Sequence, residues 1–229
     1  MNHQHNPSKK PSNKSQIDIS STTIPGTATA NTTTSTIDAH VITDPESAKG
    51  RLLTVAAKLF NQKGYERTTV RDLATAVGIQ SGSIFHHFKT KEDILKAVMV
   101  DTIVYNTERM RTQLGLTSTA RAEVLALIRC ELESITGDTG EAMAVLVYEW
   151  RSLSESNQAY ILRLRDEYEM LWMTALNKAK QEGLIDGDTF VLRRFLTGAL
   201  SWSKTWFNRE GDISIEQLAE EALKLAIKN

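Results

Sequence analysis

Residues 68–95 read TTVRDLATAVGIQSGSIFHHFKTKEDIL, and two short helical patterns follow each other within them. Apolar residues recur at helical spacing from Val70 until Gly78, which predicts a helix over 70–77 that ends at the glycine. After only a few residues, a second short helix is expected to open near Ser81. Two short helices joined by a turn that contains glycine are the outline of a helix-turn-helix, whose second member fits a major groove.

Longer helices are expected on both sides of this motif. Asp44 is the candidate N-cap of a first helix of about five turns, which ends at Gly64. A long helix is predicted from Lys91 to Gln113. Three apolar side chains of the intervening short helix are expected to face inward: Ile84, Phe85 and Phe88.

The remainder of the chain contains further amphipathic helices and no sustained period-two alternation. The sequence therefore predicts an all-α fold without strands. Candidate N-caps are Ser118, Asn157, Asp188 and Ser214. The helices are expected over 120–135, 143–153, from Asn157 to Gly183, over 190–207 and over 218–227.

Residues 1–44 differ in composition from everything that follows. They are rich in Ser, Thr, Asn and Pro and have no apolar periodicity, so ordering them would cost chain entropy with little burial in return. We predict a disordered tail, whose three lysines are either DNA contacts or simply solvated. The predicted domains are therefore a tail (1–44), a helix-turn-helix domain (45–92) and a helical bundle (93–229).

The net charge of −1 conceals a strong asymmetry along the chain. Residues 47–100 carry nine basic and four acidic side chains, whereas residues 101–229 carry 15 basic and 20 acidic ones. A positive segment attached to a negative one is a known hint of a module that binds a polyanion such as DNA.

Residues 68–95 resemble the DNA-binding signature of the TetR family of transcriptional regulators, in the order and spacing of apolar, glycine, aromatic and lysine positions across roughly residues 47–100. The resemblance implies a homodimer in which each protomer places its third helix in a major groove of a palindromic operator. It also implies a C-terminal helical domain that dimerises and holds a small-molecule inducer. Tilting of the helix over 91–113 is then expected to change the separation of the two reading helices.

Candidate DNA contacts follow from side-chain size and from the resemblance together. Small residues at the start of the third helix allow close approach to base edges, while Gln80 and Arg71 are long enough to read a purine. Arg71 is alternatively an ion-pair partner of Asp72 or Glu66. The predicted DNA-binding residues are Thr69, Arg71, Gln80, Ser81, Gly82, Ser83, Phe85, His86, His87 and Lys91.

Two of these positions depart from the family pattern. A lysine is frequent at the position of Ser81 and a tyrosine is usual at that of Phe85. One cationic and one hydroxyl contact to the DNA backbone are therefore missing, which predicts weaker sequence-independent binding than is usual in the family. Phe85 is alternatively a core residue.

The C-terminal half resembles the TetR subgroup whose characterised members sense acyl-CoA thioesters. Aromatic and Met side chains would line an apolar pocket, and arginines would meet the phosphates of a CoA group. The same residues are alternatively plain core and solvated ion pairs. The candidate ligand-binding residues are Met143, Trp150, Arg151, Arg163, Arg165, Tyr168 and Trp172.

The last two apolar stripes are predicted to form an intermolecular four-helix interface, because small and aromatic residues pack closely across such contacts. The family resemblance points to the same two helices. The predicted interface residues are Phe195, Ala199, Trp202, Trp206, Leu218, Ala222 and Leu225.

Several function classes have no support in the sequence. No phosphate loop, nucleophile elbow or zinc-protease motif is present, so we expect no enzyme activity, no cofactor and no metal site; His86 and His87 have no partner ligands at metal spacing. Cys130 is expected to be a small core residue. No apolar run approaches the roughly 20 residues that cross a bilayer, so a cytoplasmic protein is expected. The alternative function is a helical protein–protein adaptor.

Overall fold

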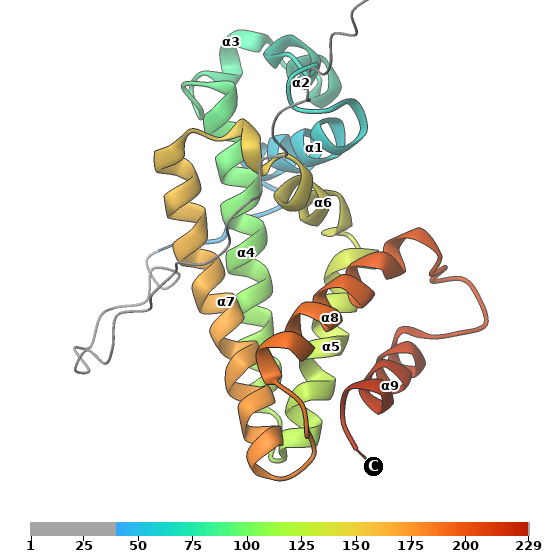
Figure 1. The fold of residues 1–229 in the computed structure, drawn as a ribbon. Coiled ribbons are helices and arrows are strands. Elements are labelled where there is room, and N and C mark those ends of the chain that lie inside the picture. The colour runs from blue at the N-terminus through green and yellow to red at the C-terminus, as the bar shows by residue number, and fades with distance from the viewer. Residues whose placement is uncertain (1–39, 229) are drawn as a thin grey trace, which may run out of the picture. The chain divides into compact units, whose positions relative to one another are not determined.

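The computed structural model describes residues 40–228, and the predicted tail over 1–44 falls largely outside them. The described residues contain helices and no strand, so the all-α prediction is confirmed (Figure 1). The α-helices are α1 (Ala48–Lys63), α2 (Val70–Val77), α3 (Ser81–Ile84), α4 (Lys91–Gly115), α5 (Ala120–Thr136), α6 (Gly140–Tyr148), α7 (Glu155–Gln181), α8 (Thr189–Trp202) and α9 (Ile215–Ala226). Two 3₁₀ turns, η1 (Trp150–Ser152) and η2 (Ser203–Thr205), follow α6 and α8.

The first helix begins later than predicted. Ser47, not Asp44, is the N-cap, because the Ser47 hydroxyl accepts a hydrogen bond from the N–H of Gly50 at 2.9 Å. The Asp44 carboxylate instead accepts from the N–H of Glu46 in the preceding turn. The end at Gly64 is confirmed.

Two other predicted caps are also wrong. Thr119, rather than Ser118, caps α5 through the N–H of Ala122. Asn157 lies inside α7, which follows Ser154 as its N-cap. The helices predicted over 143–153 and 190–207 are each interrupted, since α6 gives way to η1 and α8 to η2.

The apolar residues form two clusters, which we call the upper and lower cores from their places in Figure 1. The upper core joins α1, α2, α3 and the first half of α4 to α6 and the first half of α7. The lower core joins the end of α4 to α5, the second half of α7, α8 and α9. α4 and α7 therefore pass through both cores, and α6 packs against α1, α4 and α5. Cys130 is buried in the lower core, as expected.

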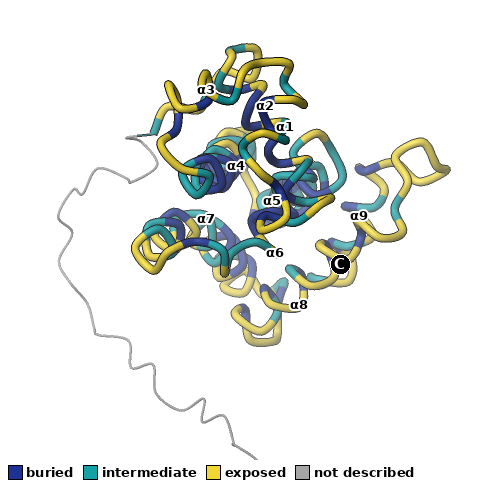
Figure 2. Tube along the Cα trace, turned by 90° about the horizontal axis from the view of Figure 1, so that it is seen from above, coloured by how far each residue is buried: buried dark blue, intermediate teal, exposed yellow. Residues whose placement is uncertain are grey.

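α8 and α9 lie at the edge of the bundle, against α5, with exposed stretches between their buried residues (Figure 2). Their inward residues, such as Leu200 and Leu223, belong to the lower core. Among residues 40–228, no helix combines the length and apolar character needed to span a membrane.

Candidate functional site

α2 begins with a reciprocal capping box. The Thr69 hydroxyl accepts from the N–H of Asp72 at 3.1 Å, and the Asp72 carboxylate accepts from the N–H of Thr69 at 2.8 Å. The Lys63 ammonium donates to the same carboxylate at 2.7 Å. The hydrogen bonds from Lys63 and then Thr69 lower the pKa of Asp72 to about 2. α2 ends at Gly78, whose φ of +79° a residue without Cβ adopts freely, so the chain turns at once toward α3.

α3 lies at one end of the described bundle (Figure 1). The residues at its start have small side chains. Gln80 is the N-cap; it is exposed together with Gly82 and Ser83, and Ser81 is half-buried. A methyl group added at Gly82 would meet no other atom within 4 Å. Because nothing bulky covers this turn, a DNA base edge has access to its backbone and to the Gln80 amide.

Phe85 does not face inward, so that expectation is wrong. Its side chain is 55% exposed, whereas Ile84 and Phe88 are buried in the upper core. Successive helical residues point about 100° apart, so a helix that buries Ile84 turns Phe85 outward. His86 and His87 are exposed beside it.

The Arg71 and Lys91 side chains differ in whether their charged groups already have a partner within the protein. Arg71 is exposed, and among the described residues neither Asp72 nor Glu66 forms an ion pair with it. The Lys91 ammonium donates to the carbonyl oxygen of Tyr65 at 2.8 Å and lies 4.0 Å from the centre of the Tyr65 ring. Arg71 is thus available to a partner, whereas Lys91 is engaged by the turn between α1 and α2.

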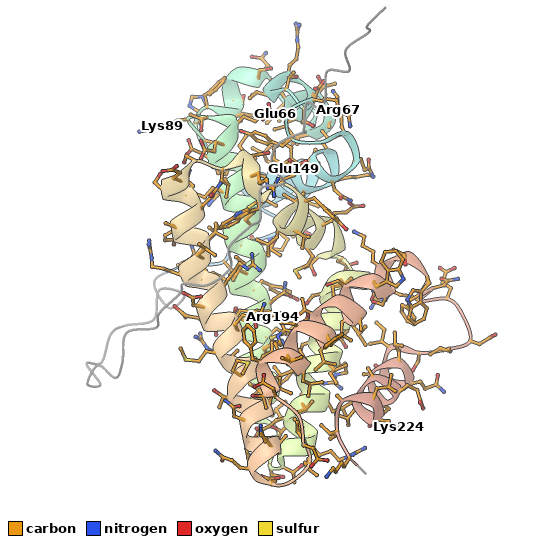
Figure 3. All side chains as sticks on the ribbon, in the orientation of Figure 1. Glu66, Arg67, Lys89, Glu149, Arg194 and Lys224 are labelled. Carbon is orange, nitrogen blue, oxygen red and sulfur yellow. The ribbon has the colours of Figure 1, made fainter. Side chains whose placement is uncertain are left out.

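Two cations near this end of the molecule were not singled out from the sequence. Arg67 and Lys89 are exposed and lie toward opposite sides of the α2–α3 unit (Figure 3). Both belong to the positive segment over 47–100, and that excess of basic residues is the sequence feature that points to them. Their charges add to the attraction of this end for a polyanion.

Glu92 ties the start of α4 to the start of α7. Its Oε1 accepts from the N–H and the hydroxyl of Ser154, at 2.8 and 2.7 Å, and from the side-chain amide of Asn157 at 2.5 Å. These hydrogen bonds, led by those from Ser154, lower the pKa of Glu92. This contact also explains why Asn157 does not cap α7.

The seven candidate ligand-binding residues fall into two groups. In the first, Trp150 packs against the upper core, and the Arg165 guanidinium lies 6.0 Å from its ring centre. Arg163 lies over the ring of Tyr160, and Arg151 is exposed. The three arginines are therefore exposed surface residues.

The second group lies deeper. Trp172 belongs to the lower core and Tyr168 packs against it, while Met143 touches both cores. The Met143 sulfur accepts a hydrogen bond from the buried Asn106 amide. The two surface hollows beside α9 are lined by none of the seven residues.

A buried charged cluster, which no pattern in the sequence predicts, surrounds Trp172. Arg193 of α8 is 1% exposed; its guanidinium lies 4.3 Å from the Trp172 ring centre and makes two hydrogen bonds to Glu169, at 3.0 and 3.1 Å. It also pairs with Glu131 of α5 at 3.3 Å, and the Tyr168 hydroxyl donates to Glu131 at 3.0 Å. Nothing in the spacing of these residues shows that they meet, because they come from three helices.

Burial raises the pKa values of two acidic groups in this cluster. Burial raises the pKa of Glu131 above its ordinary value, against the opposing charge of Arg193. Burial and then the Glu131 charge raise the pKa of Tyr168 well above its ordinary value. The indole N–H of Trp172 is buried and has no well-aligned hydrogen-bond acceptor among the described residues; the neighbouring Tyr168 hydroxyl is close enough that Trp172 lowers the pKa of Tyr168, against the larger effect of burial. An oxygen acceptor near Trp172 would therefore be favourable.

α8 and α9 expose large apolar side chains. Phe195 is 74% exposed, Trp202 67%, Trp206 54% and Leu225 89%. The other predicted interface residues range from exposed (Ala199) to half-buried (Leu218 and Ala222). Large apolar side chains exposed in this number are typical of surfaces that contact a partner.

Among the described residues, no three His, Cys, Asp or Glu side chains gather closely enough to hold a metal ion.

Two known protein families match parts of this chain. Residues 52–98 match the family described as bacterial regulatory proteins of the tetR family. Residues 117–229 match the family of tetracyclin repressor-like C-terminal domains.

Individual relatives agree with these matches. The HTH-type transcriptional repressor KstR2 of Mycolicibacterium smegmatis is 30% identical over 192 residues, 80% of this chain and 90% of the relative. A crystal structure described as superantigen pfit is 61% identical, with a TM-score of 0.74 over 82% of this chain and 93% of that one.

A third comparison concerns the fold alone. AibR, solved in complex with isovaleryl coenzyme A and operator DNA, is 23% identical, with a TM-score of 0.70 over 78% of this chain and 97% of that one. The fold, with its helix-turn-helix and helical C-terminal region, agrees with the two family matches. This chain therefore belongs to the TetR family of transcriptional regulators.

Proposed function

We propose that this protein is a repressor that binds a palindromic operator as a homodimer and is released by a small molecule, an acyl-CoA thioester. TetR-family regulators bind operator DNA as homodimers and respond to small-molecule ligands. The observation that carries the proposal for this chain is the exposed, sterically open start of α3 on a positive segment.

Reading of DNA is assigned to the α2–α3 unit. Gln80, Ser81, Gly82 and Ser83 would approach base edges, and Arg71 is free to reach a purine. The exposed residues at the far end of α3, Phe85, His86 and His87, would lie along the phosphates. Thr69 would contribute its position at the start of α2, where the backbone N–H groups favour an anion.

Dimerisation is assigned to the exposed faces of α8 and α9. Burial of Phe195, Trp202, Trp206 and Leu225 against a second copy removes apolar surface from water, which is the dominant favourable contribution to association. Under twofold symmetry the same patch serves both protomers. Ala199, Leu218 and Ala222 would complete the contact.

Ligand binding is assigned to the region around Trp172. Its indole N–H, which lacks a well-aligned acceptor, and the neighbouring Arg193 guanidinium offer donors to an oxygen such as a thioester carbonyl. Met143, Trp150 and Tyr168 would contribute apolar surface, and the surface arginines Arg151, Arg163 and Arg165 would meet CoA phosphates. The acyl-CoA bound to AibR, a protein of the same fold, supports this ligand class.

Selection of bound duplexes from a random pool, followed by gel shifts, tests the DNA part. We expect a palindrome whose half-sites lie about one helical turn, or a multiple of it, apart. Failure to bind any duplex in dilute buffer would overturn the proposal and favour the adaptor. Isovaleryl-CoA and longer thioesters are then added to the complex. Release by one of them supports the ligand assignment, whereas no thermal stabilisation and no release by any would remove it without touching DNA binding.

The description of pfit names another activity for a chain that is 61% identical to this one. The open α3 turn supplies no reason for superantigen activity in this chain. A T-cell proliferation assay on this protein measures that activity independently of the gel shift.

A further inference from the structure

The turn between α1 and α2 is held from two directions. Gly64 adopts a φ of +87°, which lets the chain leave α1 abruptly. Tyr65 then enters the upper core, 8% exposed, with its ring edge-on to Phe60 at 5.3 Å between centroids. Tyr65 is therefore one of the residues that fix where the chain starts α2, and its carbonyl also accepts from the N–H of Thr68 at 3.1 Å.

Both backbone polar groups of Tyr65 are taken by charged side chains from other parts of the chain. Its N–H donates to Oε1 of Glu149 at 3.0 Å, across 84 residues of sequence. Its carbonyl oxygen accepts from the Lys91 ammonium at 2.8 Å. A hydrogen bond to an ionised group is about twice as strong as a neutral one.

Glu149 is itself fixed in place. It follows the last residue of α6, and its second carboxylate oxygen accepts from the Ser152 hydroxyl in η1 at 3.0 Å. Figure 3 shows Glu149 on the α6 side of the turn, with Glu66 and Arg67 nearby and closer to α2. The carboxylate thus links the α6–η1 segment directly to the backbone from which the DNA-reading unit starts.

We infer that Glu149 is a positioning residue for operator binding: without touching DNA, it sets the orientation of α2 and α3 through the backbone of Tyr65. This inference rests on the proposed operator binding. Sequence-specific contacts need the reading helix in one orientation, whereas sequence-independent attraction depends on charge alone. The loss of Glu149 therefore weakens specific binding and spares non-specific binding.

The sign of the effect separates positioning from electrostatics. Removing a carboxylate near a polyanion reduces repulsion and strengthens binding to any DNA. Glu66 provides the matched control, because it is exposed, lies in the same turn and forms no ion pair or hydrogen bond through its carboxylate among the described residues. If charge alone matters, the Glu149 and Glu66 variants both bind the operator more tightly. If Glu149 acts by positioning, its variant binds the operator more weakly and the Glu66 variant does not.

The experiment compares Glu149→Ala, Glu149→Gln and Glu66→Ala in the full chain, by fluorescence anisotropy with the selected operator and with an unrelated duplex. We expect Glu149→Ala to weaken operator binding about tenfold, the equivalent of ~1.4 kcal/mol, without weakening binding to the unrelated duplex. Glu149→Gln keeps an oxygen acceptor for the Tyr65 N–H but loses its charge, so its operator affinity should lie between those of wild type and Glu149→Ala. Glu66→Ala should bind as tightly as wild type or more tightly.

Hydrogen exchange of the peptide over residues 64–69 supplies a second readout, since the Tyr65 amide should exchange faster in Glu149→Ala. If that variant does not fold, Glu149→Asp takes its place, because the shorter side chain keeps the charge but loses reach. The inference is overturned if operator affinity is unchanged, if both duplexes weaken equally, or if Glu149→Gln is as impaired as Glu149→Ala. If the wild-type protein binds no duplex, the proposed function fails instead.

Discussion

Removal of the Phe195 ring is expected to weaken the proposed homodimer strongly. Phe195 is 74% exposed on α8, so about three-quarters of its surface is free to be buried by a second copy. Full burial of such a side chain is worth about 1.5–3 kcal/mol, which gives ~1–2 kcal/mol for the exposed part. A twofold interface contains the residue twice, so Phe195→Ala should cost ~2–4 kcal/mol and raise the dimer Kd roughly 30- to 700-fold.

Sedimentation velocity over a dilution series measures this Kd, with circular dichroism to show that the fold is retained. Phe85→Ala is the matched control, because Phe85 is also a phenylalanine with more than half of its surface exposed but lies on the DNA-reading unit. It should leave the dimer Kd unchanged while weakening DNA binding. Equal dimer Kd values for the wild type and Phe195→Ala would refute the assignment of the dimer to α8.

Three further changes test other parts of the structure. Arg193→Met leaves the buried Glu131 carboxylate without its ion-pair partner and should lower the free energy of unfolding, measured in urea, by about 3–5 kcal/mol. Adding Glu131→Gln should restore part of this loss. A loss below about 1 kcal/mol would show that the buried ion pair does not form. Because the hydrogen bond from Lys63 lowers the pKa of Asp72 to about 2, its carboxylate stabilises the fold above its ordinary pKa of 3.8 and loses this contribution as the pH falls toward 2. Urea unfolding of wild type and Asp72→Asn should therefore differ near neutral pH and converge in acid; equal stability at neutral pH would argue against the capping role. Phe85→Tyr supplies the hydroxyl that is usual at this position and should tighten binding to non-operator DNA roughly 2- to 10-fold in a gel shift. Unchanged affinity would contradict a contact of this side chain with the DNA backbone.

Local patterns in the sequence were sufficient for the reading unit. α2 occupies 70–77 and ends at Gly78 as predicted, and α4 begins at Lys91 as predicted. Apolar spacing and glycine position act within one or two turns, so no distant segment was needed to interpret them. The choice among cap residues was less secure, because Asn157 serves a carboxylate 65 residues away instead of its own helix.

The sequence by itself determined the helical class, the helix-turn-helix and the resemblance to a family, because these depend on periodicity and on residues close together in the chain. Only the tertiary structure decided which distant polar groups meet. Arg193 is buried between Glu131 and Glu169, and Tyr65 is held by Glu149, although no spacing in the sequence relates these residues. The physical reason is that packing of whole helices brings such groups together, and a buried charge is tolerated only where that packing supplies its partner.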